Sequence, residues 1–322
     1  MNAPKEKAQT TEQESLIDQL MLEKYEPIAI VGIGLRFPGN SSDLDTFSQL
    51  LADGKEGITP IPQDRWDNDK YYDALPGVLG KNCTHSGGFV NALDQFDAKF
   101  FAISPKEANN MDPQQRMMLE LSWESLENAC INPDILRGGN ASVYIGVGST
   151  DFAKDIFETH GNELQSQMAT GAANSAIAGR LSYFLGLRGP CMILDTACSS
   201  SLVALHLAAN ALRNKETDLS LCGAISLIHH PSNHIALSQA NMLSPDGRCK
   251  TFDNSADGYG RSEGGAILVL KRLSDALKDK NNIVAILRGS AVLQDGESAG
   301  LTVPNGEAQE QVMRKVLSNA IL

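Results

Sequence analysis

The stretch Leu194-Asp195-Thr196-Ala197-Cys198-Ser199-Ser200-Ser201-Leu202 runs from the end of an apolar strand directly into a helix. A thiol at this junction lies over backbone N–H groups that have no partner inside the helix, and the positive end of the helix dipole favours the thiolate. The three serines suit a helix start, because hydroxyl oxygens accept hydrogen bonds from such N–H groups. Cys198 is therefore a candidate nucleophile, although a buried cysteine before a well-capped helix would give the same pattern.

The residues after the cysteine, Ser199 to Arg213, predict a helix that is apolar on nearly every side. Its apolar residues are Leu202, Val203, Ala204, Leu205, Leu207, Ala208, Ala209, Ala211 and Leu212. A helix of this composition is buried in the centre of a domain. A nucleophile in its first turn would therefore lie at the end of an apolar tunnel or pocket.

From Ser142 onward, apolar strands alternate with alanine-rich helices, after a region that is mainly helical and irregular. Strands are expected over Pro27–Gly34, Val143–Val147, Met192–Leu194, Leu219–Leu227 and Ala266–Leu270. Helices are expected over Leu44–Leu51, Pro113–Ala129, Leu164–Ala178 and Ser199–Arg213. This alternation is typical of an α/β layered fold.

The composition limits the classes of function. The chain has 322 residues, 42% of them hydrophobic, and a formal net charge of −12. It is long enough for one large domain or two fused halves, and its acidity argues against binding to nucleic acid through phosphate contacts. The longest apolar runs are strand-sized and the start, Met1 to Thr11, is polar, so we expect no membrane span, no secretion signal and a cytoplasmic location.

Residues 1–25 form a polar leader in which Leu16, Ile17, Leu20 and Met21 recur at helical spacing. This pattern suits a short amphipathic docking helix that pairs with another chain. It suits a frayed linker equally well, because an isolated helix of this length is marginal in water.

Six cysteines are spread along the chain with no close pair and no Cys-x-x-Cys: Cys83, Cys130, Cys191, Cys198, Cys222 and Cys249. Neither a disulfide framework nor a zinc site is indicated by this spacing. Most of these cysteines are expected to pack as small hydrophobic residues.

The segment Asp195 to Leu202 resembles the nucleophile signature of the β-ketoacyl synthases, and the likeness runs from about Glu26 to the last residue. Further matching segments occur in family order: Pro27 to Gly34, Arg36 to Gly39, Met111 to Arg116, Gly186 to Pro190, Leu243 to Asp253, Ala256 to Gly264 and Leu301 to Gly306. In sequence, these segments are similar to the ketosynthase domain of a type I modular polyketide synthase.

The resemblance implies the thiolase-like fold, in which two similar α/β halves each contain a five-stranded mixed sheet. Residues 26–275 would form the complete N-terminal half with the nucleophile at the start of its central helix. Residues 276–322 would only begin the C-terminal half, with its first strand over Ile283–Leu293 and its first helix over Glu307–Leu322. In the family, two catalytic histidines, a lysine and a Gly-Phe-Gly loop follow a segment like Leu301 to Gly306, and this sequence stops before them.

The implied reaction is the decarboxylative Claisen condensation of polyketide or fatty-acid biosynthesis, an acyltransferase-type chemistry. Cys198 would accept an acyl group from a carrier-protein thioester, and a malonyl-type extender would then attack it. The backbone amide of Cys198 would be one oxyanion donor. No cofactor is expected to bind directly, because the substrates arrive on the phosphopantetheine of an acyl carrier protein.

The expected partners are the acyl carrier protein, other polyketide-synthase domains, and a second chain, either as a homodimer or to supply the rest of the second half. We expect self-acylation without carbon–carbon bond formation, and an isolated chain that is poorly soluble or needs a partner. The alternative is a non-catalytic remnant or docking module that keeps the fold without condensing anything.

None of the histidines lies in a sequence motif as specific as the one around Cys198. His206 lies eight residues after Cys198 on the same helix, about 12 Å along its axis, which is too far for a proton transfer. His160, in Thr159-His160-Gly161, only weakly resembles one of the family's histidine motifs, and it precedes the nucleophile instead of following it. The spacing of His229, His230 and His234 is compatible with a metal site, but a solvated or packed loop is the simpler interpretation, and no metal is expected. Asp257 and Glu263 are expected to shape their glycine-rich loop instead of acting as an acid and base pair.

Overall fold

The computed structural model describes residues 25–75, 77–148, 150–161 and 166–320. The proposed docking helix in the leader lies outside these described residues. No described helix is both long enough and apolar enough to span a membrane.

A mixed sheet in the order β5-β4-β6-β7-β1-β8 forms the centre of the fold. Its strands are β1 (Ile28–Arg36), β4 (Ala141–Val147), β5 (Cys191–Leu194), β6 (Leu219–Ser226), β7 (Gly264–Arg272) and β8 (Ala285–Leu287). β4 is parallel to β5 and β6, whereas β7 is antiparallel to β6 and β1, and β8 is antiparallel to β1. The five strands predicted for the first half are confirmed, and β8, part of the strand predicted over Ile283–Leu293 for the second half, adds a sixth to the five-stranded sheet that was expected. It does so because three of its residues pair with Ile28 to Ile30 at the open edge of β1.

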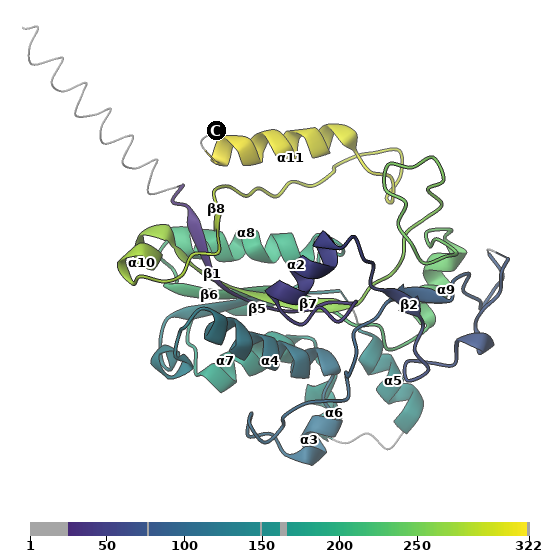
Figure 1. The fold of residues 1–322 in the computed structure, drawn as a ribbon, viewed down its shortest axis with the longest axis horizontal. Helices are drawn as coiled ribbons and strands as arrows, with labels where there is room; N and C mark the ends of the chain where they lie inside the picture. Colours follow the sequence, from purple (N-terminus) through teal and green to yellow (C-terminus); the bar gives the residue numbers. More distant parts are fainter. Residues whose placement is uncertain (1–24, 76, 149, 162–165, 321–322) are drawn as a thin grey trace, which may run out of the picture.

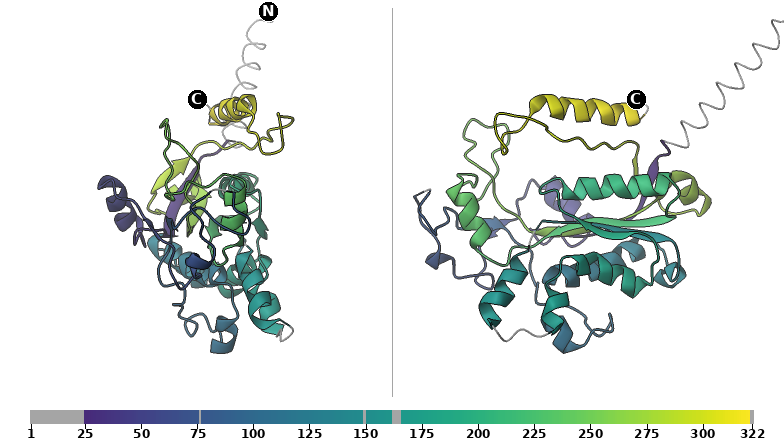
Figure 2. Two further views of the ribbon diagram at one scale, coloured as in Figure 1. Left: turned by 90° about the vertical axis from the view of Figure 1, so that its right-hand side faces the viewer. Right: turned by 180° about the vertical axis from the view of Figure 1, so that it is seen from behind.

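Helices cover both faces of this sheet (Figure 1). α4 (Pro113–Asn128) and α7 (Ser175–Leu185) pack on one face, and α8 (Ser200–Arg213) packs on the other. α11 (Gly306–Asn319) lies beyond α8, on the side away from the sheet (Figures 1 and 2). The remaining helices are α2 (Leu44–Ala52), α3 (Pro105–Asn109), α5 (Asp151–His160), α6 (Ser166–Gly171), α9 (Ser232–Gln239) and α10 (Leu273–Lys278), with short 3₁₀ turns at Asn68–Lys70 and Pro133–Leu136. A separate pair, β2 (Ile58–Pro60) and β3 (Ser86–Gly88), lies outside the main sheet.

The alternation of side chains along β4 divides the core into two layers. Val143, Ile145 and Val147 belong to the cluster under α4 and α7, and Tyr144 belongs to the cluster under α8. All residues of β4 are buried, as expected for a strand in the interior of a sheet that is covered on both faces. The apolar runs in the sequence therefore correspond to strands with two buried faces.

The helix predicted over Leu164–Ala178 is wrong in one respect, because two helices, α6 and α7, occupy this region. The side chain of Gln115 lies at the break, where its Nε2 donates to the carbonyls of Thr170 (3.0 Å), Gly171 (2.7 Å) and Ala173 (3.3 Å). These carbonyls are satisfied from α4 instead of from the next helical turn. A glutamine 55 residues earlier in the chain thus ends the helix, which local periodicity could not indicate.

Asp112 caps the start of α4 and offers a test of the pH dependence of stability. Its Oδ1 accepts a hydrogen bond from the N–H of Gln114 at 2.8 Å, and burial raises its pKa from 3.8 to about 6. Between these two values the folded carboxyl retains a proton that the unfolded chain has lost. Its contribution to stability therefore falls as the pH rises from about 4 to about 6, by about 3 kcal/mol in total.

Asp112→Asn should remove this dependence while keeping the cap, since asparagine is an equally good capping residue. We expect the stability of the variant relative to the wild type to rise by about 3 kcal/mol between pH 4 and pH 7.5, as measured by urea unfolding at both pH values. Taking the difference in stability between the variant and the wild type cancels the contributions of the other titrating groups. An equal difference at both pH values would show that Asp112 does not hold a proton in the folded protein.

Candidate functional site

The turn between β5 and α8 is held in a strained conformation. Ala197 has φ +54°, a left-handed conformation that costs a residue with a side chain about 1 kcal/mol or more. The carboxylate of Asp195 supports the turn by accepting a hydrogen bond from the N–H of Ala197 at 3.0 Å. This agrees with the expectation that the stretch joins a strand directly to a helix.

The serines after Cys198 stabilise the turn and not the helix start. Ser200 Oγ accepts from the N–H of Thr196 at 2.8 Å and donates to the carbonyl of Ala197 at 2.7 Å. Ser199 Oγ donates to the carbonyl of Thr196 at 2.8 Å. The expectation that hydroxyls would cap the first N–H groups of α8 is wrong, because Ser199 has a helical backbone (φ −87°, ψ −3°) instead of the extended one that aims a capping side chain.

Cys198 is exposed, so the described residues form no tunnel around it. The reason is the one-sided packing of α8, whose buried residues Ala204, Ala208, Ala209, Ala211 and Leu212 face the sheet. Leu202, on the other side of the helix, is 69% exposed. The prediction of a helix covered on every side is therefore wrong for the described part of the chain.

The start of α8 depends on a glycine in the neighbouring strand. A Cβ atom on Gly146 of β4 would lie 2.8 Å from the carbonyl carbon of Ser200 and 2.9 Å from the nitrogen of Ser201. Both are backbone atoms, so the helix would have to move. Sequence reasoning overlooked this residue, although a glycine inside a strand is a known signal of close backbone approach.

Gly146→Ala should displace the first turn of α8 and with it Cys198. We expect a loss of about 1–3 kcal/mol in stability, measured by thermal melting, together with slower alkylation of Cys198. Gly148→Ala is the matched control, because a Cβ there meets nothing within 4 Å. Equal melting temperatures for the two variants would contradict the close approach.

The loop of residues 242–260 lies on the side of the molecule to which the N-terminal end of α8 points (Figures 1 and 2). Tyr259 in this loop is close enough to Cys198 for charge on the sulfur to act on its phenol. Burial raises the pKa of Tyr259, the charge of Arg261 lowers it, and negative charge on Cys198 and Cys249 raises it. Tyr259 and these two cysteines therefore share one electrostatic neighbourhood, which sequence reasoning did not find.

Only Cys83 and Cys222 of the six cysteines are buried. The other four lie in turns, loops or the edge strand β5, so the expectation that most cysteines would pack inside is wrong: Cys130, Cys191, Cys198 and Cys249. The turn and the dipole of α8 distinguish Cys198 from the other exposed thiols.

Glu263 is a buried structural carboxylate, as expected. It pairs with Arg65 and accepts hydrogen bonds from the N–H groups of Val90 and Ile228, each at 2.9 Å. Asp257 pairs with Lys250 at 2.7 Å inside its own loop. Each carboxylate thus has a partner that holds a loop in place.

The histidines of the described residues have partners away from Cys198. His206 Nδ1 lies 2.8 Å from Ser290 Oγ, and its Nε2 lies 2.9 Å from Asn210 Nδ2. His230 pairs with Glu158 at 3.0 Å. His229 and His234 are largely buried, and burial lowers their pKa values to about 4 and about 3. Nothing is described of the side chain of His160.

No group of three or more potential metal ligands is found among the histidines, cysteines and carboxylates that the structure describes. His234 instead lies 2.9 Å from Arg261 through its Nδ1, and its ring is 5.2 Å from that of Trp66. His229 and His230 therefore lie in a loop, whereas His234 is buried in helix α9, so the expectation of a loop is wrong for His234.

Comparison with known proteins gives a consistent set of matches. Residues 25–276 match the family model described as β-ketoacyl synthase, N-terminal domain. The chain is 49% identical over 300 residues to one polypeptide of the phenolphthiocerol/phthiocerol polyketide synthase of Mycobacterium tuberculosis, and this match covers 92% of the chain and 14% of that polypeptide. It is 48% identical over 292 residues to another polypeptide of the same synthase and organism, and this match covers 91% of the chain and 19% of that polypeptide.

Solved ketosynthases have the same fold. The ketosynthase from module 6 of the bacillaene synthase of Bacillus subtilis 168 matches with a TM-score of 0.81 and 39% identity. An oxazolomycin ketosynthase domain of Streptomyces albus matches with a TM-score of 0.85 and 34% identity. Each match covers 92% of this chain, and the chain spans 49% and 51% of those two structures.

Proposed function

The chain belongs to the β-ketoacyl synthase family, as the N-terminal part of a ketosynthase domain of the type I polyketide synthase kind, and we propose that its Cys198 is the acyl-accepting nucleophile. The observation that carries this proposal is the position of Cys198. It is an exposed thiol in a strained turn at the start of a 14-residue helix. Strained backbone is concentrated at functional sites, and a helix start favours the thiolate.

The proposed first step is acyl transfer from a carrier protein. The thiolate of Cys198 attacks the carbonyl carbon of the thioester, a new carbon–sulfur bond forms, and the bond to the phosphopantetheine sulfur breaks. The released thiolate takes up the proton that the Cys198 thiol gave up. The backbone N–H of Cys198 is the proposed donor to the oxyanion, a role that needs a donor already in place.

In the proposed second step, a malonyl-type unit loses CO₂ and its enolate attacks the carbonyl carbon of the Cys198 thioester. The new carbon–carbon bond replaces the bond to sulfur, and Cys198 leaves as a thiolate. The described histidines 85, 206, 229, 230 and 234 are engaged with side chains other than Cys198. We therefore assign only the acylation step to the described residues.

Acylation tests the proposal directly. The probe is an acyl-N-acetylcysteamine thioester, followed by intact-mass measurement and peptide mapping. We expect one acyl group per chain, located on the peptide that contains Cys198. Acyl groups distributed evenly over the four exposed cysteines would contradict a specific nucleophile.

One observation supports the alternative that the chain is a docking module. Apolar side chains face solvent on the far side of α8 and on α11, where Leu202 is 69%, Met313 59% and Leu317 53% exposed. Such a surface favours association with another polypeptide, which we propose to be a ketosynthase or another polyketide-synthase domain. Self-association without any acylation of Cys198 would favour this alternative over the enzyme.

A further inference from the structure

Arg116, in the first turn of α4, carries a guanidinium group that no described side chain holds. Its Nε is buried and has no hydrogen-bond partner among the described residues. The carboxylates whose charges reach it are those of Asp112, Asp94 and Glu120, and in the described part of the chain none of them forms an ion pair with it. Buried donors without a partner are rare in folded proteins, so this guanidinium needs an explanation.

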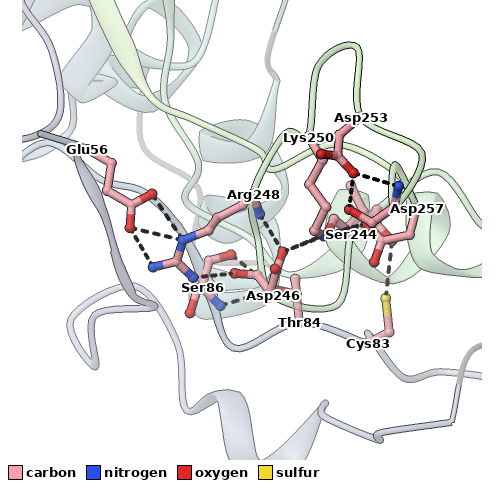
Figure 3. Close-up of polar contacts among 12 residues, drawn as sticks. Glu56, Cys83, Thr84, Ser86, Ser244, Asp246, Arg248, Lys250, Asp253 and Asp257 are labelled. Carbon is pink, nitrogen blue, oxygen red and sulfur yellow. Dashed lines mark hydrogen bonds and ion pairs between the residues drawn. The ribbon is translucent and has the colours of Figure 1, made fainter. Parts of the chain in front are cut away.

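Other arginines of the protein show which group such a guanidinium binds. Arg248 is bound by both carboxylate oxygens of Glu56, at N to O distances of 2.6–3.0 Å (Figure 3). Arg36 is bound by Glu124 through Nη1 at 2.8 Å and also through Nη2. The planar guanidinium offers pairs of N–H groups that match the two oxygens of a carboxylate. A carboxylate is therefore the group that best fits Arg116.

Arg116 lines a cavity of about 210 Å³ between the start of α4, the end of β1 and the loop that follows β3. The lining is apolar at Val90, Leu93 and Met117 and polar at Arg116 and Gln95. Pockets for drug-sized ligands measure about 300–1,000 Å³, so this cavity suits a smaller molecule. The mixed lining favours a ligand with one charged end and a short apolar part.

The charges around the cavity limit the ligand to a single negative charge. Arg36 also lines the cavity, but its ion pair with Glu124 neutralises it. Glu120 adds a carboxyl group to the lining, and burial raises the pKa of this group. The site therefore offers one unpaired guanidinium, and the nearby carboxyl group opposes a ligand with two negative charges.

We propose that this cavity binds a short-chain aliphatic monocarboxylate, with its carboxylate on Arg116 and its alkyl chain against Val90, Leu93 and Met117. The inference does not depend on the proposed role of Cys198. Burial of each methylene favours binding by about fourfold. The affinity should therefore rise from acetate to propionate and from propionate to butyrate.

Isothermal titration calorimetry of the full chain with sodium butyrate tests the inference. Butyramide has nearly the same shape and no charge, and it should bind at least tenfold more weakly than butyrate. Arg116→Gln should weaken butyrate binding at least tenfold. Arg314→Gln removes an equal charge from α11, on the other side of the sheet, and should bind butyrate as the wild type does. No butyrate binding to the wild type, or equal binding to Arg116→Gln, would overturn the inference.

Glu120→Gln tests the charge balance of the cavity, and it carries the test if circular dichroism shows that Arg116→Gln does not fold. The substitution removes the carboxyl group that opposes the ligand, and the amide oxygen can still accept the hydrogen bond from the N–H of Asp97. We expect this variant to bind butyrate at least twofold more tightly. Glu310→Gln, on α11, is the matched control and should leave the affinity unchanged. The same affinity in both glutamate variants would place the ligand outside this cavity and overturn the inference.

Discussion

Cys198→Ala is expected to abolish self-acylation by an acyl thioester, with a fall in rate of at least about 10³-fold. The reason is that the acyl group is transferred to sulfur, and alanine offers no atom to hold it. The fold should persist, because Cys198 is exposed and its side chain supports no part of the core. Intact-mass measurement of samples quenched at successive times gives the rate of acylation.

Cys249→Ala is the matched control for this variant. Its thiol is exposed and lies in the same neighbourhood as Cys198, because both influence Tyr259. We expect this control to acylate at the wild-type rate. If Cys198→Ala is still acylated as fast as the wild type, and the label appears on Cys249, the nucleophile has been assigned to the wrong residue.

The strands of this fold could be predicted from sequence because the sheet is covered on both faces. A strand with two buried faces gives a continuous apolar run, such as the one over Val143–Val147, and this signal needs no long-range information. The strand predicted over Ile283–Leu293 was too long, because only Ala285–Leu287 pair, at the open edge of β1. The break between α6 and α7 was missed because a distant side chain, Gln115, makes it.

The candidate site was predictable in its centre and not in its surroundings. Local sequence predicted that Cys198 lies at a strand-to-helix junction, but it left a buried cysteine as an equal alternative, and only the resemblance to the β-ketoacyl synthases favoured a nucleophile. The surroundings come from elsewhere: Gly146 lies on the neighbouring strand β4, and Tyr259 is held in its loop by backbone hydrogen bonds to Met242 and Ser244. Spacing along the chain could not show the approach of Gly146 to α8, since it arises from the order of the strands in the sheet.

Glu263→Gln is expected to produce a large loss of stability, because this carboxylate is buried just before the start of β7. The Glu263 side chain is 0% exposed and the guanidinium-bearing side chain of Arg65 is 4% exposed, with N and O atoms 3.2 Å apart. Removing one partner of a buried ion pair typically costs about 3–5 kcal/mol, because the other charge stays buried. We expect about 3 kcal/mol, at the lower end, because Arg65 also pairs with Asp64.

The same substitution loosens three loops at once, since the carboxylate also accepts from the N–H groups of Val90 and Ile228. Glutamine has one acceptor oxygen instead of two and cannot serve both amides and Arg65 together. Urea unfolding measures the loss, and Glu56→Gln is the control. Glu56 pairs with Arg248 at the surface, where such a pair contributes at most about 1 kcal/mol. Equal stability of the two variants would mean that Glu263 is not the buried link between these loops.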